Sequence, residues 1–371
     1  MKLFCCALLL AAAAARQPEA GYTFEHYKAE FGKTYTGAEH EARKAAFADN
    51  LRKIHEHNAD TTSTWKMGVN EHADLTPKEF AARFLAAKGG LFEPHAAFTA
   101  EHQAVFRAHH ANDVPVTDLP GAMDWRTKNV VTPVKNQGGC GSCWAFSTAE
   151  TLESHIAIQT GKLMTFAPQE FVSCAPNPDK CGGTGGCQGS TQWLGFKYAE
   201  AAGITLEDSY PYTARTGTCD ESKIKPVANI TGYVRLPANN YTALMNAVAN
   251  VGPVAISAAA EPWQLYDSGV YDGRCGTDVD HAIQLVGYGS DSVNGKASDY
   301  WLVRNSWGGS WGEKGYIRIA RFGATTAGEP CATDKTPLDG TGCQGGPKTL
   351  EVCGLCGIMS DSSYPTGGHL A

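Results

Sequence analysis

Cysteine is absent over a long stretch near the N-terminus: none of the 13 cysteines lies between Gln17 and Gly139. Disulfides are therefore excluded as the support of this stretch. Runs of lysine and arginine are also absent and the formal net charge is −7, so the sequence lacks the basic surface that a nucleic-acid partner would require. Internal repeats are missing as well, which excludes a repeat architecture.

Long apolar runs are scarce, and the clearest one stands at the N-terminus. Lys2 is followed by apolar residues from Leu3 to Ala15, and then by Arg16. The run is shorter than the roughly 20 residues that span a bilayer. Its positive start and small residues are typical of a secretory signal peptide at residues 1–15, with a buried helix end as the alternative. The cleavage positions that fit are Ala14, Ala15 and Ala20. We therefore expect a secretory-pathway protein without a membrane span, bound for a lysosome, a vacuole or the outside of the cell.

The cysteines that are present have an odd count. Cys5 and Cys6 belong to the signal peptide, and the other eleven lie between Cys140 and Cys356. Five disulfides would leave one free thiol. In a secreted protein a single unpaired thiol is a candidate reactive group.

Residues 21–88 form a charge-rich block with helical periodicity. Apolar side chains recur at helical spacing in two runs, which are Phe24, Tyr27 and Phe31, then Phe47, Leu51 and Ile54. Gly32 and Gly37 are expected to separate the two helices. A short strand is predicted at Trp65–Val69, followed by a helix that Thr76 caps. The block is predicted to be a small helical domain.

The composition changes after residue 88. Residues 89–118 are rich in Ala and His without a sustained period, and we interpret them as a solvated linker open to proteolysis. A helix is predicted from Cys143 to about Gln159, stopped by Gly161. Five strands are predicted further on, at Asn229–Leu236, Val254–Ala258, Ala282–Tyr288, Tyr300–Asn305 and Gly315–Ile319. Helices followed by strands predict an α+β fold for residues 119–371.

Cys143 is the best candidate for the free, reactive thiol. It opens the predicted helix after a run of small residues that let a ligand approach the backbone. The helix dipole and its free N–H groups stabilise a thiolate, which is the form that attacks carbonyl carbons. The attack needs donors for the resulting oxyanion, and the side chain of Gln137 and the Cys143 backbone N–H are placed to supply them.

A thiolate nucleophile also needs a base to hold and return a proton. Among 12 histidines, His281 stands at the start of a buried-strand pattern, with Asn305 in a later Asn-Ser-Trp-Gly sequence. An amide can accept from one imidazole nitrogen and leave the other to face the thiolate. Trp307 is expected to shield that bond from water.

These motifs together resemble the papain-like cysteine proteases, on the cathepsin L side of the family. Cys-Gly-Ser-Cys-Trp-Ala-Phe, Asp-His-Ala and Asn-Ser-Trp-Gly occur in the family's order, and the resemblance runs from about residue 22 to residue 366. It implies a two-domain fold, with a helical left domain and a β-barrel-like right domain preceded by an inhibitory helical pro-domain. The implied reaction is peptide-bond hydrolysis with no metal or other cofactor.

Several alternative interpretations of single residues remain open. Cys140 and Cys143 form a Cys-x-x-Cys that could belong to a redox or zinc site, but the cysteine count favours disulfides. His155 lies on the same helix as Cys143, facing away from its start, and is interpreted as structural. Asp280 precedes the candidate base and is given a minor role.

The N-terminal block carries a further family pattern. Six residues at spacings of three and four match the pro-peptide helix signature of cathepsin L-like precursors; they are Glu39, Arg43, Phe47, Asn50, Ile54 and Asn58. A second pro-peptide motif follows at Gly68–Asp74, where His72 replaces the usual Phe. In the family this segment runs backwards through the cleft and blocks it, and acid weakens it. The mature chain is expected to begin near Leu119, within residues 112–121.

The resemblance also implies disulfide pairs and leaves others open. The implied pairs are Cys140–Cys187, Cys174–Cys219 and Cys275–Cys356. Four cysteines stay unassigned: Cys181, Cys331, Cys343 and Cys353. Three of these lie in or beside residues 322–349, which are longer than the same region of cathepsin L. Glycosylation sequons stand at Asn229 and Asn240.

The residues implied to bind substrate are Gly189, Ser190, Thr191, Gln192, Ser257, Val279, Ala282, Trp307 and Asp361. Gly189 is expected to bond the substrate backbone, and Ser190 replaces a usual Gly. Most of the pocket for P2, the second residue before the scissile bond, is small or apolar. Asp361 would let it accept Arg or Lys as well as apolar side chains, unless this carboxylate points to solvent.

The sequence thus predicts a secreted cysteine endopeptidase precursor. Its expected partners are protein and peptide substrates, its own pro-peptide and cystatin-type inhibitors, and the family expectation is a monomer. Two other functions are weighed. A catalytically silent binding protein is disfavoured because the Cys and His are both present, and a peptide ligase would differ only in the acceptor of the acyl group.

Overall fold

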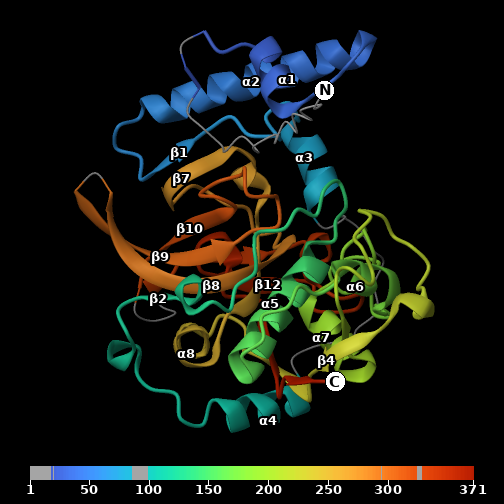
Figure 1. The fold of residues 1–371 in the computed structure, drawn as a ribbon. Coiled ribbons are helices and arrows are strands. Elements are labelled where there is room, and N and C mark those ends of the chain that lie inside the picture. Colours follow the sequence, from blue (N-terminus) through green and yellow to red (C-terminus); the bar gives the residue numbers. More distant parts are fainter. Residues whose placement is uncertain (1–17, 20, 86–98, 294, 324–327) are drawn as a thin grey trace, which may run out of the picture.

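The computed structural model describes residues 18–19, 21–85, 99–293, 295–323 and 328–371. The signal peptide expected at residues 1–15 lies outside these ranges, as do residues 86–98 of the expected pro-domain and linker and residues 324–327 of the insertion. Figure 1 shows the N-terminal helices at the top, against one edge of a large sheet, with helix α5 near the centre. Among the described residues, no helix combines the length and apolarity needed to cross a bilayer.

The N-terminal block folds as a helical unit. Its elements are α1 Phe24–Phe31, α2 Gly37–Ala59, β1 Trp65–Met67 and α3 Pro77–Phe84. The predicted ends are confirmed, because Gly32 caps α1 in the left-handed region and Thr76 forms a capping box with Glu79 at α3. Gly37 opens α2 with a positive φ of 55°.

The signature residues of α2 join this helix to the turn that follows β1. Asn50 donates to the carbonyl oxygens of Ala73 and Leu75, both at 2.8 Å. Arg43 forms two hydrogen bonds with the Glu79 carboxylate, at 2.7 and 3.0 Å. Asn58 bonds the backbone of Met67 in both directions. Phe47 and Ile54 are buried between these polar residues, whereas Glu39 is exposed. The signature residues thus join α2 to the segment after β1 and to α3 by hydrogen bonds on either side of a buried apolar centre.

The large sheet runs in the order β1-β7-β10-β9-β8-β6-β13-β5, with β2 paired to β8. Its further strands are β2 Met123–Asp124, β5 Gly232–Arg235, β6 Val254–Ala258, β7 Tyr266–Tyr271, β8 His281–Val293, β9 Lys296–Arg304, β10 Tyr316–Arg321 and β13 Ser362–Thr366. The N-terminal block therefore supplies the edge strand β1, which pairs antiparallel with β7.

One predicted strand, Asn229–Leu236, is two strands in the structure. Pro226–Asn229 is β4, which joins a small separate sheet with β3 Ile204–Thr205 and β14 His369–Leu370, whereas β5 joins the large sheet. The chain changes sheets at Thr231, whose N–H donates to the Thr366 carbonyl oxygen at 3.0 Å. Alternation of side chains cannot reveal such a switch, because both strands are half-buried.

The helical half packs against the sheet through one long helix. The helices are α5 Cys143–Thr160, α6 Pro168–Cys174 and α7 Gln192–Ala202, and α8 Tyr241–Asn246 lies beside the sheet. α5 ends at Gly161 in the left-handed region, as predicted. Ser147 on α5 donates to the Ile283 carbonyl oxygen of β8 at 2.7 Å. Short helical turns are η1 Val116–Asp118, η2 Trp125–Lys128, η3 Glu221–Lys223, η4 Ala247–Val251, η5 Glu261–Leu265, η7 Pro337–Asp339 and η8 Leu355–Gly357.

The linker expected over residues 89–118 is exposed at most of its described positions, as predicted, but the expectation that it lacks regular structure is wrong. Ala100–His109 forms helix α4, which packs on β5, and Thr99 caps it. Val114 exchanges two hydrogen bonds with the Asn246 side chain, at 3.0 and 2.9 Å. The apolar positions of α4 are too few to show helical periodicity in the sequence. Their packing partners belong to the sheet half, which is distant in sequence. The segment is therefore docked over much of its length.

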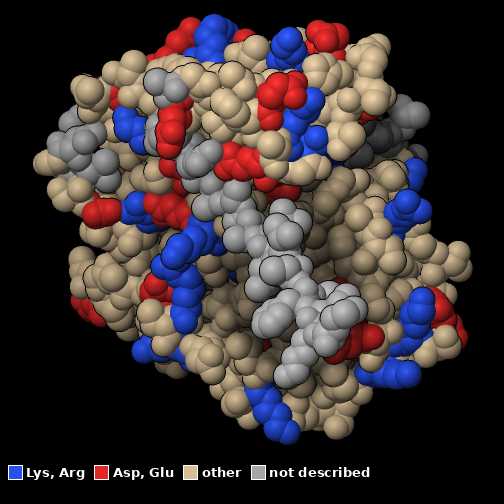
Figure 2. Space-filling model, turned by 45° about the horizontal axis from the view of Figure 1, so that its top comes forward, with Lys and Arg blue, Asp and Glu red and all other residues tan. Residues whose placement is uncertain are grey.

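Ten of the eleven cysteines in the described ranges form five disulfides. The pairs Cys140–Cys187, Cys174–Cys219 and Cys275–Cys356 are those that the resemblance implies. The cysteines left open pair as Cys181–Cys343 and Cys331–Cys353. Cys140 and Cys143 therefore do not act as a unit, and neither do Cys353 and Cys356, which form a second Cys-x-x-Cys. On the face drawn in Figure 2, acidic and basic side chains are interspersed.

Candidate active site

Cys143 stands at the first position of α5 and is the one free cysteine among the described residues. Only 2% of its surface is exposed. The N–H groups of the helix start and the Ala282 backbone N–H lie near its sulfur and stabilise a negative charge there. Because Ala282 follows His281 in β8, this contact brings the thiol to the candidate base.

His281 and Asn305 are brought together as predicted. The imidazole Nε2 and Asn305 Oδ1 are 2.8 Å apart, and both residues are buried. Nδ1 of His281 has no hydrogen-bond partner within the described residues, so it is the nitrogen left for the thiol. The two residues lie on one sheet, because β8 and β9 are neighbours and Asn305 directly follows β9. The amide thus fixes the ring orientation.

Trp307 covers this hydrogen bond. Its ring stacks on His281 with centroids 4.7 Å apart and planes inclined by 24°. Trp311 meets Trp307 edge to face at 5.0 Å. Both indoles are fully buried, so water has little access to the His281–Asn305 bond.

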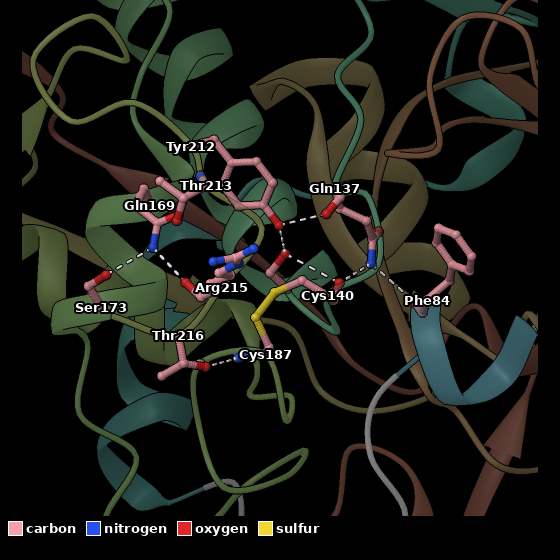
Figure 3. Close-up of a disulfide and its surroundings, with 12 residues drawn as sticks. Phe84, Gln137, Cys140, Gln169, Ser173, Cys187, Tyr212, Thr213, Arg215 and Thr216 are labelled. Carbon is pink, nitrogen blue, oxygen red and sulfur yellow. Dashed lines mark hydrogen bonds between the residues drawn. A yellow bond between two sulfur atoms is a disulfide. The ribbon is translucent and has the colours of Figure 1, made fainter. Parts of the chain in front are cut away.

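Gln137 is held rigidly beside the start of α5. Its Oε1 accepts from Ser306 Oγ at 2.6 Å, and its Nε2 donates to the Cys140 carbonyl oxygen at 2.9 Å. The same Nε2 donates to the Phe84 carbonyl oxygen at 2.9 Å. Figure 3 shows Phe84 at the end of α3, with its carbonyl turned to Gln137. A backbone carbonyl of the N-terminal block therefore occupies the Gln137 Nε2 donor.

Sequence reasoning missed Tyr212 as part of this arrangement. Its hydroxyl donates to the Gln137 carbonyl oxygen at 2.7 Å and lies 2.6 Å from Ser142 Oγ (Figure 3). The Cys140–Cys187 disulfide lies next to it. Tyr212 stands in a loop with no motif around it, so no sequence signal indicates its role.

The covered site is electrically neutral. Burial raises the pKa of the Cys143 thiol to about 11, although the helix start and Ala282 N–H oppose this shift. Burial likewise lowers the pKa of His281 to about 4, opposed by the Asn305 hydrogen bond. With the N-terminal block in place, thiol and imidazole therefore stay uncharged at neutral pH. A helix start alone predicts a lowered thiol pKa, and burial of the thiol accounts for the difference.

The cover is built largely from aromatic rings. Phe80 of α3 meets Trp307 edge to face at 4.9 Å, and Phe84 lies 6.4 Å from it. His72 packs edge to face on Phe84 at 4.5 Å and on Phe80 at 5.5 Å. The imidazole of His72 therefore occupies an aromatic environment that would also suit Phe, next to the Trp307 indole.

The residues expected to bind P2 converge. Asp361 Oδ2 accepts from Gln192 Nε2 at 2.9 Å and from Ser257 Oγ at 3.0 Å. Ala282 pairs with Ser257 across β8 and β6, and Val279 lies two residues before His281. Asp361 is half-buried, so its carboxylate is not directed wholly into solvent. Gly189, Ser190 and Thr191 precede Gln192 in a buried loop.

A basic residue near Asp361 was also missed. Arg235 on β5 lies over the Trp193 ring, 4.6 Å from its centroid. Burial lowers the pKa of Arg235, and the Asp361 charge opposes this. Among the described residues, Nη1 of Arg235 has no hydrogen-bond partner. The Asp361 carboxylate therefore already interacts electrostatically with one positive charge of the protein, that of Arg235.

The structure agrees with a structural role for His155 and a minor role for Asp280. His155 Nε2 donates to the Pro253 carbonyl oxygen at 2.8 Å, and the ring stacks on Tyr364. Asp280 accepts from the Ala260 backbone N–H at 3.2 Å. The His155 contact lies within the core, whereas the Asp280 charge adds to the burial that raises the pKa of Cys143.

Known proteins match the chain over most of its length. Residues 119–365 match the family model described as papain family cysteine protease, and residues 24–80 match the cathepsin propeptide inhibitor domain (I29). The oryzain beta chain of Oryza sativa subsp. japonica is 41% identical over 335 residues, which are 89% of this chain and 62% of that relative. Fruit bromelain of Ananas comosus is 35% identical over 347 residues, covering 91% and 92%.

Solved structures agree with this assignment. A recombinant stem bromelain precursor has a TM-score of 0.72 at 33% identity and covers 93% of this chain and 97% of its own. Digestive procathepsin L 3 of Tenebrio molitor larval midgut has a TM-score of 0.69 at 32% identity, with coverage of 92% and 97%. The chain belongs to the papain family of cysteine proteases. More narrowly, it is a cathepsin L-like precursor with its pro-domain, and the predicted two-domain α+β fold is confirmed.

Proposed function

We propose that Cys143 is the nucleophile, His281 the base, Asn305 its orienting partner and Gln137 an oxyanion donor. The observation that carries this assignment is the 2.8 Å bond between His281 Nε2 and Asn305 Oδ1, which leaves Nδ1 for the one free thiol. The geometry supports separate side-chain roles for nucleophile, base, orienting amide and oxyanion donor.

The reaction follows from these positions. His281 Nδ1 takes the proton of the Cys143 thiol, and the thiolate attacks the scissile carbonyl carbon. A C–S bond forms, and the carbonyl oxygen becomes an anion that Gln137 Nε2 and the Cys143 N–H stabilise. The carbonyl re-forms as the C–N bond breaks, and His281 Nδ1 gives its proton to the leaving amine. Water then attacks the thioester while His281 takes its proton, which releases the carboxylic acid and restores the thiol.

The precursor organisation is proposed as follows. Residues 1–15 are the signal peptide, 21–88 the inhibitory pro-domain, 89–118 the activation segment and 119–371 the mature peptidase with the 322–349 insertion. Passage through the secretory pathway to a lysosome, vacuole or the outside fits the five disulfides. Asn229 and Asn240 are half-buried candidates for glycans. Cystatin-type inhibitors and a monomeric state remain expectations of the family.

The P2 pocket is proposed to accept apolar residues and also Arg or Lys. Support comes from the Asp361 carboxylate, which Gln192 and Ser257 hold at the base of the converging residues. Both donors bind the same oxygen, Oδ2, so Oδ1 is the atom left for a guanidinium or ammonium group.

The test is hydrolysis by the acid-processed precursor. Fluorogenic Leu-Arg and Arg-Arg substrates are assayed between about pH 4.5 and about pH 7, with Cys143→Ala as the matched control. Activity that appears on acid treatment and is lost in the control supports the proposal. An inactive processed wild type, with the pro-domain demonstrably removed, contradicts it.

A further inference from the structure

The insertion forms a bridge between the two halves of the molecule. It leaves the sheet half as a hairpin of β11 Cys331–Asp334 and β12 Leu350–Cys353, closed at its base by the Cys331–Cys353 disulfide. Cys353 is part of the core of the sheet half. The connection between the two strands is the part that extends outwards, and we call its residues 336–344 the strap.

The strap first runs along one wall of the expected P2 pocket. Thr336 Oγ1 donates to Asp278 Oδ1 at 2.8 Å. Gly340 then lies against Val279, because a Cβ atom at Gly340 would be 2.6 Å from the Val279 carbonyl oxygen. Only glycine fits at such a distance from a neighbouring backbone. The strap is therefore in direct contact with the chain two residues before His281.

The strap then reaches the opposite wall. Gly182 N–H donates to the Gly342 carbonyl oxygen at 3.0 Å, and Gln344 N–H donates to the Asp179 carbonyl oxygen at 2.8 Å. The Cys181–Cys343 disulfide makes the junction covalent. Cys343 also packs with the buried side chains of Trp193 and Leu194.

This junction is coupled to the loop that holds the pocket. A Cβ atom at Gly182 would lie 2.6 Å from the Ser190 carbonyl oxygen, so strap anchor and pocket loop are in backbone contact. Between Gly340 and Cys343 the strap thus passes from the Val279 wall to the Ser190 wall. The two halves already pack together through α5 and β8, and the Cys181–Cys343 disulfide adds a covalent link between them at the strap.

We propose that the strap is a specificity-determining element that bounds the substrate cleft beyond the P2 pocket. It restricts peptides that extend N-terminally past P3 and keeps the width of the pocket fixed. The proposal rests on the P2 assignment of the proposed function. The favoured substrates are peptides with few residues before the scissile bond, and unfolded proteins cleaved near their N-termini.

A length series tests the idea on the processed full-length protein. Fluorogenic substrates with a constant Leu-Arg end are extended at their N-terminus through P3, P4 and P5. We expect kcat/KM of the wild type to fall by about ten-fold from P3 to P5, and the Cys181→Ser/Cys343→Ser double variant to lose this fall. The Cys174→Ser/Cys219→Ser double variant, which removes a bond within the helical half, is the control and keeps the wild-type profile. Mass spectrometry verifies that the reductant in the assay leaves Cys181–Cys343 intact.

A second pair of variants leaves all cysteines in place. Gly340→Ala puts a methyl group against Val279 and must displace the strap, whereas Gly276→Ala adds one whose nearest atom is 4.0 Å away. Gly340→Ala is expected to flatten the length profile, and Gly276→Ala is expected to preserve it. A length profile that is the same in wild type and both strap variants overturns the proposal. Failure of the proposed function is distinguishable, because it would abolish hydrolysis of the unextended Leu-Arg substrate.

Discussion

The side-chain Nε2 of Gln137 donates to the carbonyl oxygen of Phe84 at 2.9 Å. With Gln137 as the proposed oxyanion donor, the pro-domain places a neutral carbonyl where a reacting carbonyl would acquire charge. Because a peptide carbonyl cannot develop an anion without attack, the contact occupies the donor without using it. In this precursor the pro-domain carbonyl therefore blocks a donor that is already in place.

Replacing this amide should affect turnover. We expect Gln137→Ala to lower kcat of the processed enzyme by about 10²- to 10³-fold with a smaller effect on KM, because the donor acts on the transition state. Single-turnover acylation separates this from a folding defect, which would reduce the active fraction instead. A change confined to KM would contradict the role.

The thiol should be unreactive until the cover leaves. With a pKa of about 11, only a very small fraction of Cys143 is thiolate at neutral pH in the precursor. Removal of the pro-domain ends the burial that raises this pKa, so alkylation by iodoacetamide should become much faster. The rate is measured by mass spectrometry at Cys143 before and after processing, with Cys143→Ala as the blank. Equal rates in both forms would refute this account.

His72 should make the release of the pro-domain sensitive to acid. Burial lowers its pKa from 6.5 to about 3, and the nearby Lys33 charge acts in the same direction, while Glu71 Oε1 lies 3.9 Å from Nε2. The released segment binds a proton at higher pH than the docked one. Docking is therefore at full strength above pH 6.5 and weakens as the pH falls towards about 3.

The variant His72→Phe tests this linkage. It keeps an aromatic ring between Phe80 and Phe84 and removes the titration, so activation should need a lower pH than in the wild type. His55→Gln, on the exposed side of α2, is the control. An unchanged pH profile of activation in His72→Phe would assign the acid response to other groups.

Asp361 should determine the charge preference at P2. We expect Asp361→Asn to lower the ratio of Arg-Arg to Leu-Arg hydrolysis by about ten-fold, because the amide retains the contacts with Gln192 and Ser257 without the charge. Asp361→Ala should show the same ratio. A ratio that does not change in either variant leaves the pocket without a role for this carboxylate, and Arg235 would then be its effective counter-charge.

The activation segment should resist proteolysis while it is docked. Asn246→Ala removes both hydrogen bonds to the Val114 backbone, at about 1 kcal/mol each. We expect faster cleavage within residues 99–118 in limited proteolysis, while the rest of the chain is unaffected. Asn250→Ala, whose side chain bonds only Asn246, is the matched control. Cleavage at the wild-type rate would mean that α4 alone holds the segment.

The parts that could be predicted from sequence are those that short-range chemistry determines. Thr76 with Glu79 and Gly161 after α5 are local signals, and both helix ends lie where they indicate. Cys143, His281 and Asn305 are recognisable because each stands in a motif. Their convergence follows from strand neighbours that the family resemblance supplies.

The parts that could not be predicted depend on contacts distant in sequence. Four unassigned cysteines allow three pairings, and only the path of the strap selects Cys181–Cys343. Helix α4 has a stripe too short to be seen, and its stability depends on β5 and Asn246. Tyr212 is in a loop where the role of a residue depends wholly on what packs against it.

The position of strand β1 at the edge of the large sheet affects the order of folding and processing. The outermost strand of the large sheet belongs to a part that processing discards, and Thr64 and Val270 exchange backbone and hydroxyl hydrogen bonds along that border. After its loss, β7 is an edge with open N–H and carbonyl groups, a template for pairing with another chain. The large sheet thus folds with β1 in place and loses this strand afterwards. A peptidase made without its first 88 residues would have to fold with the β7 edge exposed.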